Sequence, residues 1–376
     1  MKIIYPYNEI LPIKKAHDAY VVRTCASLAA AGHDVTLLCG KGSLRKEELF
    51  DFYKIDRKNP LKVISLPILR KNNKFHINWN FIFFWSARRY IERHEPDIVI
   101  CSVLKQADFL LKSKLKGCKY IYEVHQLQWY PTLKEHMRLN RIFWERSIFN
   151  RCDLVTVTTD ALKNILKVYP YDLKSQIEVV PLACDFAPLP PQKRGKILKL
   201  FYVGQLYAKQ GLHRLLDALK EVKDVELHVV GGQPLQIEHY QSYCNEKGIA
   251  NRVIFKGFIP PEHFDKELKE ANAFVTTFDN TERMPYVAHT KIYEYLAMKR
   301  PIMGPNLKIV KEHAPYGLLT YEPDSRDSLI GALKKLTDPV TLEKLNNEVA
   351  KNKVLNWNSR GLYITKLIEN QLFSKK

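Results

Sequence analysis

A lysine and a glutamate three positions apart open a predicted helix late in the chain. Lys291 and Glu294 belong to HTKIYEYLA (289–297), which follows a polar loop, has one apolar side and has Thr290 as its expected N-cap. Backbone N–H groups and the helix dipole at such an N-terminus favour an anion such as phosphate. Lys291 would add a positive charge, and Glu294 would lie on the same side to bind ribose hydroxyls. An exposed structural Lys–Glu pair is the alternative interpretation.

Glycine-containing loops follow predicted strands in the same half of the chain. The segment GQLYAKQG (204–211) stands between the strand LFYV and a helix, and Gly231 and Gly232 follow the strand LHVV. Glycines at such junctions permit a tight turn and the close approach of a phosphate group. Either loop alone is weak evidence for a phosphate-binding site. Their order along the chain, ahead of Lys291, is what points to a phosphate site.

Strand and helix patterns alternate along nearly the whole chain, which predicts an α/β protein with two doubly wound parallel sheets. Apolar runs indicate strands at 2–5, 35–39, 63–66, 97–102, 120–124, 154–158, 177–180, 199–203, 226–230, 253–256 and 274–277, and a further short strand begins at 302–303. Helical patterns are found at 17–31, 80–94, 133–152, 160–169, 212–222, 237–247, 261–271, 289–297, from 325 onwards and at 353–373. Ligands of open parallel sheets bind beyond the carboxyl ends of the strands, so the expected site is a cleft between the two sheets.

Composition narrows the classes of function. The chain has 376 residues, 46% of them hydrophobic, and no apolar run reaches the ~18 residues of a membrane span. The N-terminus lacks the long apolar segment of a signal peptide, and the seven scattered cysteines include no CxxC pair. We therefore expect a cytoplasmic protein with buried thiols and neither a disulfide framework nor a zinc site.

The formal net charge of +19 predicts an anionic partner, such as a phosphorylated substrate or an anionic membrane surface. No recognition helix, base-stacking pattern or zinc motif accompanies the charge, so nucleic-acid binding is not expected. Residues 69–93 interleave Lys and Arg with Trp and Phe, which suits peripheral binding to the inner face of a membrane. A core helix with solvated ends is the alternative.

Several segments of the C-terminal half match one family in order: FYVGQLYAKQGLHRLLDAL (201–219), LHVVGGQP (227–234), VIFKGFIP (253–260), HTKIYEYLAMKRPIMG (289–304) and YGLLTYEPDSRDSLIGAL (316–333). Through them the chain resembles the retaining glycosyltransferases of the GT-B fold, specifically family 4. The N-terminal half agrees less specifically, through AAAGHDVTLL (29–38), HEPDIVI (94–100), YEVHQL (122–127) and VVPLACD (179–185).

The resemblance implies a domain organisation. It gives an acceptor-binding Rossmann-like domain at 1–187, a proline-rich linker at 188–197 and a nucleotide-sugar-binding Rossmann-like domain at 198–350. The two domains would face each other across a cleft. A C-terminal helix, within 351–376, would cross back and pack on the first domain.

The resemblance also implies roles for particular residues. Glu294 matches the carboxylate that binds the donor ribose, the backbone of Thr290–Ile292 matches the amides that hold the diphosphate, and Gly204 matches the glycine of the diphosphate loop. His125 matches a histidine beside the reacting sugar; a packed structural histidine is the alternative. The further predicted donor-binding residues are Gln205, Gln210, Gly232, Glu282, Tyr286, His289 and Ile292. Lys209 and Lys291 are predicted to help His125 in catalysis, and Lys14, Lys15 and His17 to bind the acceptor.

The sequence departs from the family pattern at three donor positions. Tyr286 stands where a first glutamate is usual, with Glu282 as the nearest upstream carboxylate. Gln205 and Gln210 stand where an arginine and a lysine are usual, so Lys209 or Lys291 would have to supply the positive charge.

The expected activity is metal-independent, hexosyltransferase-like transfer from a nucleotide sugar to a glycan or glycolipid of polysaccharide or lipopolysaccharide biosynthesis. Negative charge builds on the departing diphosphate, so pre-placed cations and N–H dipoles would stabilise the transition state. The sequence offers no clear nucleophile, in agreement with the front-face attack that the resemblance implies. No Asp-x-Asp motif is present, and no cofactor beyond the donor is expected. A nucleotide-sugar epimerase and a non-catalytic, degenerate GT-B binding protein are the alternatives.

Overall fold

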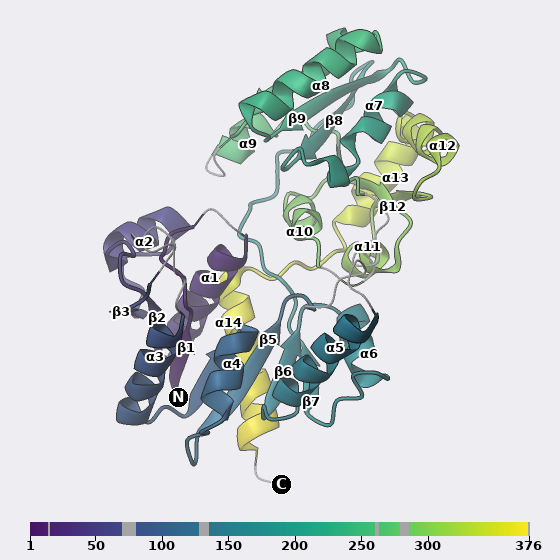
Figure 1. Cartoon of the computed structure of the whole chain (residues 1–376). Coiled ribbons are helices and arrows are strands. Elements are labelled where there is room, and N and C mark those ends of the chain that lie inside the picture. Colours follow the sequence, from purple (N-terminus) through teal and green to yellow (C-terminus); the bar gives the residue numbers. More distant parts are fainter. Residues whose placement is uncertain are drawn as a thin grey trace. The chain divides into compact units, whose positions relative to one another are not determined.

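The chain forms two compact units, Met1–Leu182 with Leu355–Lys376, and Ala183–Val354 (Figure 1). The structure is a computed structural model that describes residues 1–13, 16–69, 80–127, 135–259, 263–278, 286 and 288–374, without the side chains of Ala16, Glu135 and Lys209. The predicted linker, 188–197, falls within the second unit, and the end of the chain falls within the first.

Unit 1 contains a parallel sheet in the order β3-β2-β1-β4-β5-β6-β7. Its strands are β1 (Lys2–Pro6), β2 (Asp34–Gly40), β3 (Lys62–Leu66), β4 (Ile98–Cys101), β5 (Lys119–Val124), β6 (Leu154–Val157) and β7 (Gln176–Val179). Its helices are α1 (Ala16–Ala30), α2 (Lys46–Tyr53), α3 (Phe81–His94), α4 (Leu104–Leu111), α5 (Glu135–Phe149), α6 (Asp160–Lys167) and α14 (Trp357–Ile368). Every residue of β4 and β6 is buried, as expected for strands covered on both faces.

Unit 2 repeats the same topology, with the strand order β10-β9-β8-β11-β12-β13. Its strands are β8 (Leu198–Val203), β9 (Val225–Val230), β10 (Val253–Gly257), β11 (Ala273–Val275), β12 (Ile302–Pro305) and β13 (Leu318–Tyr321). Its helices are α7 (Leu212–Leu219), α8 (Pro234–Glu246), α9 (Phe264–Glu267), α10 (Thr290–Ala297), α11 (Lys308–His313), α12 (Arg326–Leu336) and α13 (Pro339–Val349), with short 3-10 turns at Ala208–Gln210 and Ala250–Arg252. The two doubly wound sheets confirm the predicted fold class.

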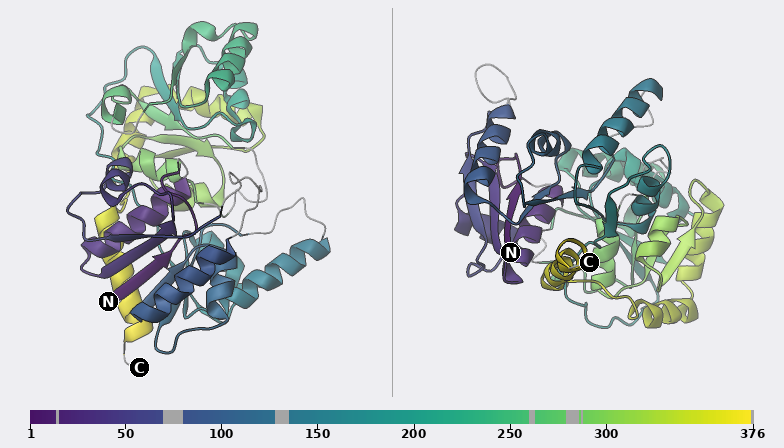
Figure 2. Two further views of the ribbon diagram at one scale, coloured as in Figure 1. Left: turned by 60° about the vertical axis from the view of Figure 1, so that its left-hand side comes forward. Right: turned by 90° about the horizontal axis from the view of Figure 1, so that it is seen from below.

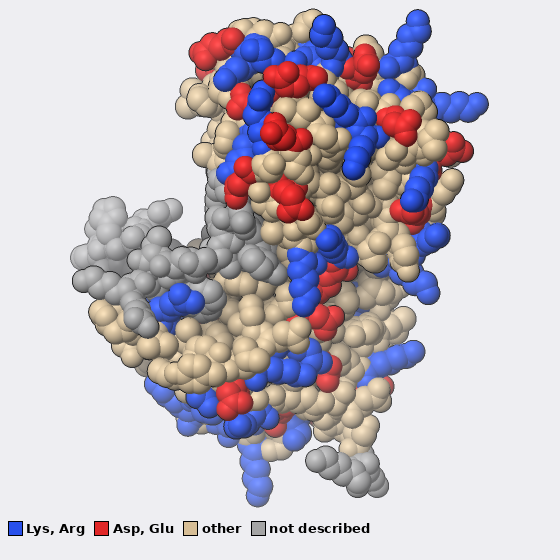
Figure 3. All heavy atoms as spheres, turned by 90° about the vertical axis from the view of Figure 1, so that its right-hand side faces the viewer, with Lys and Arg blue, Asp and Glu red and all other residues tan. Residues whose placement is uncertain are grey.

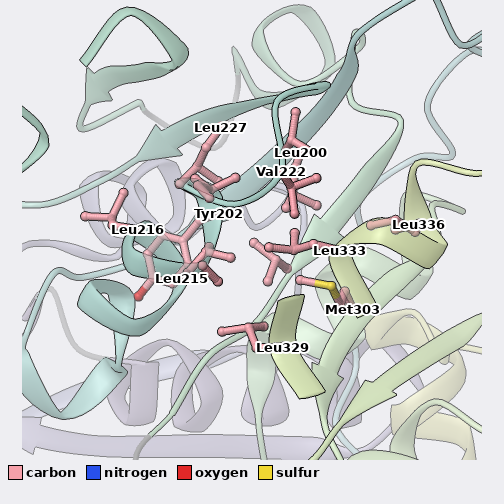
Figure 4. Close-up of a cluster of buried hydrophobic side chains, with 14 of the residues drawn as sticks. Leu200, Tyr202, Leu215, Leu216, Val222, Leu227, Met303, Leu329, Leu333 and Leu336 are labelled. Carbon is pink, nitrogen blue, oxygen red and sulfur yellow. The ribbon is translucent and has the colours of Figure 1, made fainter. Parts of the chain in front are cut away.

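An aliphatic core holds α7 and α12 against the sheet of unit 2 (Figure 4). Tyr202 of β8 is one of the three buried tyrosines within it. Its ring lies beside Leu215 and Leu216 of α7, and its hydroxyl points away from the aliphatic cluster. A buried tyrosine hydroxyl needs a hydrogen-bond partner, and the Tyr202 hydroxyl donates to the backbone oxygen of Gln205 at 2.9 Å.

Helix α14 lies alongside α1 in unit 1, although the two helices come from opposite ends of the chain (Figures 1 and 2). Gly361 permits this close approach, because a Cβ atom there would lie 2.3 Å from the backbone oxygen of Ser27. The Thr365 hydroxyl also lies 2.8 Å from Nε2 of His33. The C-terminal helix is therefore part of the first unit, in agreement with the predicted fold.

On the face shown in Figure 3, Lys and Arg side chains are interspersed with Asp and Glu. None of the helices in the described part of the chain combines the length and apolarity required to cross a bilayer. Six of the seven cysteines are buried, as the sequence predicts.

Candidate active site

The N-terminus of α10 lies one residue earlier than the sequence predicts. His289 occupies the N-cap position and Thr290 is the first helical residue, so the prediction of Thr290 as N-cap is wrong. The His289 ring stacks on Phe278, with centroids 4.2 Å apart, and the extended backbone of His289 (φ −97°, ψ 96°) places it before the first helical residue. The Ile292 N–H donates to the backbone oxygen of His289 at 3.0 Å. The Thr290 and Lys291 amides are therefore better candidates for binding an anion than that of Ile292.

A buried tyrosine fastens α10 to the end of β8. The N–H of Val203 donates to the Tyr295 hydroxyl at 3.0 Å, and the Tyr295 ring stacks on Phe274 of β11 with centroids 4.2 Å apart. Strands β8 and β11 are neighbours at the point where the strand order reverses, which is where ligands of doubly wound sheets bind. Tyr295 thus fixes the helix N-terminus at the expected binding edge of unit 2.

Lys291 reaches from α10 across to the loop that follows β8. Its Nζ donates to the Tyr202 hydroxyl at 3.1 Å and to Oε1 of Gln210 at 3.3 Å, and lies 4.4 Å from the Tyr202 ring centroid. A Cβ atom on Gly204 would lie 2.3 Å from this ammonium. Only glycine at 204 therefore leaves room for the ammonium in its observed position.

The ammonium of Lys291 is in an environment that disfavours its charge. Burial lowers its pKa from 10.5 to about 8, and the negative charge of Glu294 opposes this effect. A bound anion would stabilise the charged form and raise the pKa again. The position is thus suited to a ligand that brings its own negative charge.

The glycine loops of unit 2 are packed tightly against one another. A Cβ atom on Gly231 would lie 2.2 Å from the Gly204 carbonyl oxygen, and one on Gly232 would lie 2.5 Å from Cδ1 of Leu206. The Gly231 N–H donates to the backbone oxygen of Gly257 at 2.6 Å. The backbones of Gly204, Gly231 and Gly257 therefore lie against one another, and the Leu206 side chain packs on Gly232.

The remaining predicted donor residues occupy varied environments. Gln205 is exposed, Glu294 is half-buried and Tyr286 is buried. Glu282 lies outside the described residues, as does the side chain of Lys209. The structure therefore brings together Gly204, Gln210, Lys291 and the start of α10, and does not describe an interaction of Glu282 or Lys209 with them.

A pocket of about 180 Å³ lies beside Gly211, at the end of the loop that follows β8. Gly211, Thr277 and Phe278 line it, and two arginines from α7 and α12 also contribute. Both arginines are ion-paired, Arg214 with Asp324 and Arg326 with Glu221, so the pocket carries little net charge. The rest of the lining consists of Asp217, Tyr321, Asp324, Ser325 and Leu329.

Two histidines meet at the carboxyl edge of the sheet in unit 1. The ring of His125, just after β5, contacts the ring of His17 edge-on at 4.6 Å and that of Tyr20 at 4.3 Å. Burial lowers the pKa of His125 well below 6.5, and the positive charges of His17 and Arg360 add to this effect. His125 is therefore a neutral imidazole, and its buried Nε2 has no hydrogen-bond partner within the described part of the chain.

His17 lies beside a tyrosine whose hydroxyl is held by an aspartate. The Tyr7 hydroxyl donates to Oδ1 of Asp18 and lies 3.1 Å from Nδ1 of His17. The other predicted acceptor residues, Lys14 and Lys15, lie outside the described residues. Of the acceptor set, the structure thus shows His17 alone, beside His125.

Sequence reasoning missed the tyrosines that position these groups. The Tyr202 hydroxyl accepts a hydrogen bond from Lys291, Tyr295 links α10 to β8, and Tyr20 packs on His125. Their only sequence signal is a hydroxyl-bearing residue within an otherwise apolar strand or helix. Among the described residues, no three His, Cys, Asp or Glu side chains gather in an arrangement that could hold a metal ion.

Comparison with known proteins identifies relatives of both units. Residues 18–187 match the family Glycosyltransferase Family 4, and residues 198–338 match Glycosyl transferases group 1. No curated protein sequence matches the chain.

Solved structures share the fold along the whole chain. Sucrose-phosphate synthase from Thermosynechococcus elongatus has a TM-score of 0.76 at 17% identity, covering 100% of both chains. Anabaena HepE in complex with UDP has a TM-score of 0.73 at 14% identity, covering 98% of this chain and 100% of its own. The lipopolysaccharide outer core galactosyltransferase WaaB has a TM-score of 0.68 at 14% identity, with the same coverage of 98% and 100%.

Proposed function

Because the chain belongs to the glycosyltransferases of the family 4 and group 1 type, we propose that it transfers a sugar from a UDP-sugar donor to a glycan or lipid-linked acceptor. Transfer retains the anomeric configuration and needs neither a metal ion nor a cofactor beyond the donor. The donor binds unit 2, and His125 of unit 1 acts beside the reacting sugar. The acceptor is drawn from surface polysaccharide or lipopolysaccharide biosynthesis.

One observation carries the proposal: the Lys291 ammonium lies over Gly204 at the N-terminus of α10. A diphosphate there would receive a charge-assisted hydrogen bond from Lys291, backbone N–H donors and the favourable end of the helix dipole. The same groups would stabilise the negative charge that develops on the diphosphate as the sugar leaves. A cation and helix dipole so placed support a metal-independent reaction.

The donor base and the stereochemistry rest on further observations. HepE, which shares the fold, was solved with UDP, and uracil is therefore our choice of base. Glu294 lies one helical turn after Lys291, where its carboxylate can accept hydrogen bonds from the ribose. Since Glu294 is assigned to the ribose, no carboxylate is assigned as a covalent nucleophile, and retention would then proceed by front-face attack, as the resemblance to the retaining family implies.

A calorimetric titration tests the donor site. UDP, GDP, ADP and CMP are titrated into the wild type, Glu294→Ala and Lys291→Met. We expect UDP to bind, and each substitution to weaken it by about 1.5–3 kcal/mol, roughly tenfold or more, because each removes a hydrogen bond to or from a charged group.

The matched control is Lys308→Met, which removes an exposed lysine from the first turn of another helix, α11. UDP affinity is expected to be unchanged in this variant. Failure of every nucleotide to bind the folded wild type, or equal weakening by Lys308→Met, would contradict the donor site. With a bound donor, the anomeric signal of the product in a proton NMR spectrum distinguishes retention from inversion.

We also propose that α3 of unit 1 binds an anionic membrane that presents a lipid-linked acceptor. Phe81 and Trp85, one turn apart, are 55% and 50% exposed, and the Arg89 guanidinium lies 5.2 Å from the Trp85 ring centroid. Exposed aromatic rings flanked by arginines suit an anionic bilayer surface. Of the predicted segment 69–93, residues 70–79 lie outside the described residues.

Vesicle sedimentation tests membrane binding. The wild type is expected to pellet with anionic phosphatidylglycerol vesicles and not with neutral phosphatidylcholine vesicles, and Phe81→Ser/Trp85→Ser is expected to stay in solution. Leu235→Ser/Val340→Ser is the control, because Leu235 and Val340 are exposed apolar residues of unit 2. Pelleting that is independent of lipid charge, or equal in both double variants, would exclude a role for α3.

A further inference from the structure

An ion pair is buried in unit 1 between the C-terminal helix and the strand that leads to His125. Arg360 of α14 and Glu123 of β5 are 0% and 5% exposed, and Nη2 of Arg360 lies 3.8 Å from Oε1 of Glu123. Burying two charges carries a desolvation cost that often cancels their attraction, so stability alone is a weak explanation for such a pair.

Every part of the Arg360 guanidinium is held in place. Its Nε donates to the backbone oxygen of Pro181 at 2.9 Å, Nη1 donates to the Thr24 hydroxyl at 2.8 Å, and Nη2 donates to the Tyr20 hydroxyl. The guanidinium carbon also lies 4.4 Å from the Tyr20 ring centroid. Bonds of this kind fix the planar fork in one orientation.

Tyr20 connects this guanidinium to His125. Its hydroxyl accepts from Arg360 and donates to Oε1 of Glu123 at 3.3 Å, while its ring meets the His125 ring at 4.3 Å and an interplanar angle of 82°. Glu123 stands two residues before His125 in the chain, and its Oε2 accepts from the Tyr5 hydroxyl at 2.6 Å. Arg360 therefore fixes both the aromatic neighbour of His125 and the strand end that carries it.

We propose that Arg360 is a positioning residue for the transfer reaction, which orients the His125 imidazole through Tyr20 and Glu123. The inference rests on the proposed function, in which His125 acts beside the reacting sugar. The C-terminal helix then contributes to the active site of unit 1 in addition to covering the α1 surface. Its effect is exerted through Tyr20 and Glu123, so Arg360 itself need not touch the substrate.

The charge of Arg360 acts on the same group. The charged and titratable groups around His125 are His17 and Tyr20 of α1, Glu123 of β5 and Arg360 of α14. Burial lowers the pKa of His125, and the Arg360 cation contributes to this. Removal of the cation is therefore expected to raise the pKa of His125 toward its usual value, which a purely structural role would not do.

The test compares three substitutions by two measurements. Arg360→Met, Arg360→Lys and the control Thr365→Val are assayed for transfer from the UDP-sugar, and the His125 ring is titrated by proton NMR. Thr365→Val removes a different polar contact of α14, the one with His33. We expect Arg360→Met to raise the pKa of His125 and to lower kcat by roughly tenfold to a hundredfold. UDP affinity is expected to change by less than twofold, because UDP binds unit 2.

Arg360→Lys keeps the charge and loses the planar fork, so we expect the His125 titration to return toward that of the wild type while kcat stays low. Thr365→Val is expected to change neither. If Arg360→Met fails to fold, Arg360→Met/Glu123→Gln removes both buried charges and is measured in its place.

An unchanged His125 titration in Arg360→Met, an unchanged kcat in Arg360→Met/Glu123→Gln, or an equal loss of kcat in Thr365→Val would overturn the inference. The proposed function would be overturned if the wild type neither binds nor consumes any UDP-sugar. If Arg360→Met still changes the His125 titration in that case, the effect of Arg360 on His125 is established independently of the proposed function.

Discussion

UDP binding is expected to weaken as the pH rises above about 8, because in the proposed donor site the diphosphate is held by the protonated form of Lys291. Burial lowers the pKa of this ammonium to about 8. The group is then roughly 90% protonated at pH 7 and roughly 10% protonated at pH 9. If only the ammonium form holds the anion, Kd increases roughly tenfold between these two pH values, or by about 1.4 kcal/mol.

The direction of this pH dependence follows from the order of two pKa values, that of Lys291 in the free protein and that of Lys291 in the UDP complex. The bound anion raises the pKa of Lys291 above that of the free protein, so binding takes up a proton between the two values. Phosphate oxygens of UDP change their protonation near pH ~6 and are constant above neutrality. The uracil base titrates identically with every protein variant, so the difference between variants isolates the lysine.

Calorimetry of UDP binding between pH 6.8 and 9.0 measures the effect, and buffers of different ionisation enthalpy report the proton uptake. Lys291→Met is expected to bind weakly at neutral pH, with no additional weakening from the protein at higher pH. The control Lys308→Met keeps the pH dependence of the wild type. Equal pH dependence in the wild type and Lys291→Met would refute the assignment of Lys291 to the diphosphate.

Three further substitutions test individual contacts. Gly204→Ala places a Cβ atom 2.3 Å from the Lys291 ammonium and strains a backbone φ of +149°. UDP titration is therefore expected to show a loss of affinity as large as that of Lys291→Met. Unchanged affinity would mean that the ammonium can move without affecting UDP binding. Gly361→Ala overpacks the α1–α14 contact, and urea unfolding is expected to show a free energy of unfolding lower by about 1–3 kcal/mol. An unchanged free energy of unfolding would contradict this close contact. Tyr295→Phe leaves the Val203 N–H without its hydroxyl partner. The free energy of unfolding is expected to fall by about 1–3 kcal/mol and Tm by several degrees. An unchanged Tm would contradict this anchoring of α10.

The sequence predicts the two sheets well because strands buried on both faces form short apolar runs. Strands such as β4 and β9 are recognisable for this reason, and so is the alternation with helices. The strand β13 was not predicted: its residues are mostly half-buried, so it lacks a continuous buried run. The short helices α2, α4 and α11 were missed because six to eight residues show too little periodicity.

The candidate site is predictable where it depends on local sequence and unpredictable where it depends on contacts between distant segments. The position of Lys291 in the first turn of α10 and the glycine at 204 are both local features. The hydrogen bond from Lys291 to Tyr202 joins residues 89 positions apart, and that from Arg360 to Tyr20 joins residues 340 positions apart. No local pattern indicates which tyrosine hydroxyl will be adjacent to which cation.

The same contacts explain how this chain can keep a cation at the proposed donor site without the lysine at position 210 that the family pattern leads one to expect. Gln210 accepts a hydrogen bond from the Lys291 ammonium at 3.3 Å, so the neutral side chain now orients a cation that comes from α10. A second lysine at 210 would place two like charges close together in a half-buried location, which disfavours both. Glutamine removes this repulsion and supplies an acceptor for the remaining cation. The departure at 210 is therefore consistent with a working donor site, in which the charge comes from the helix instead of the loop.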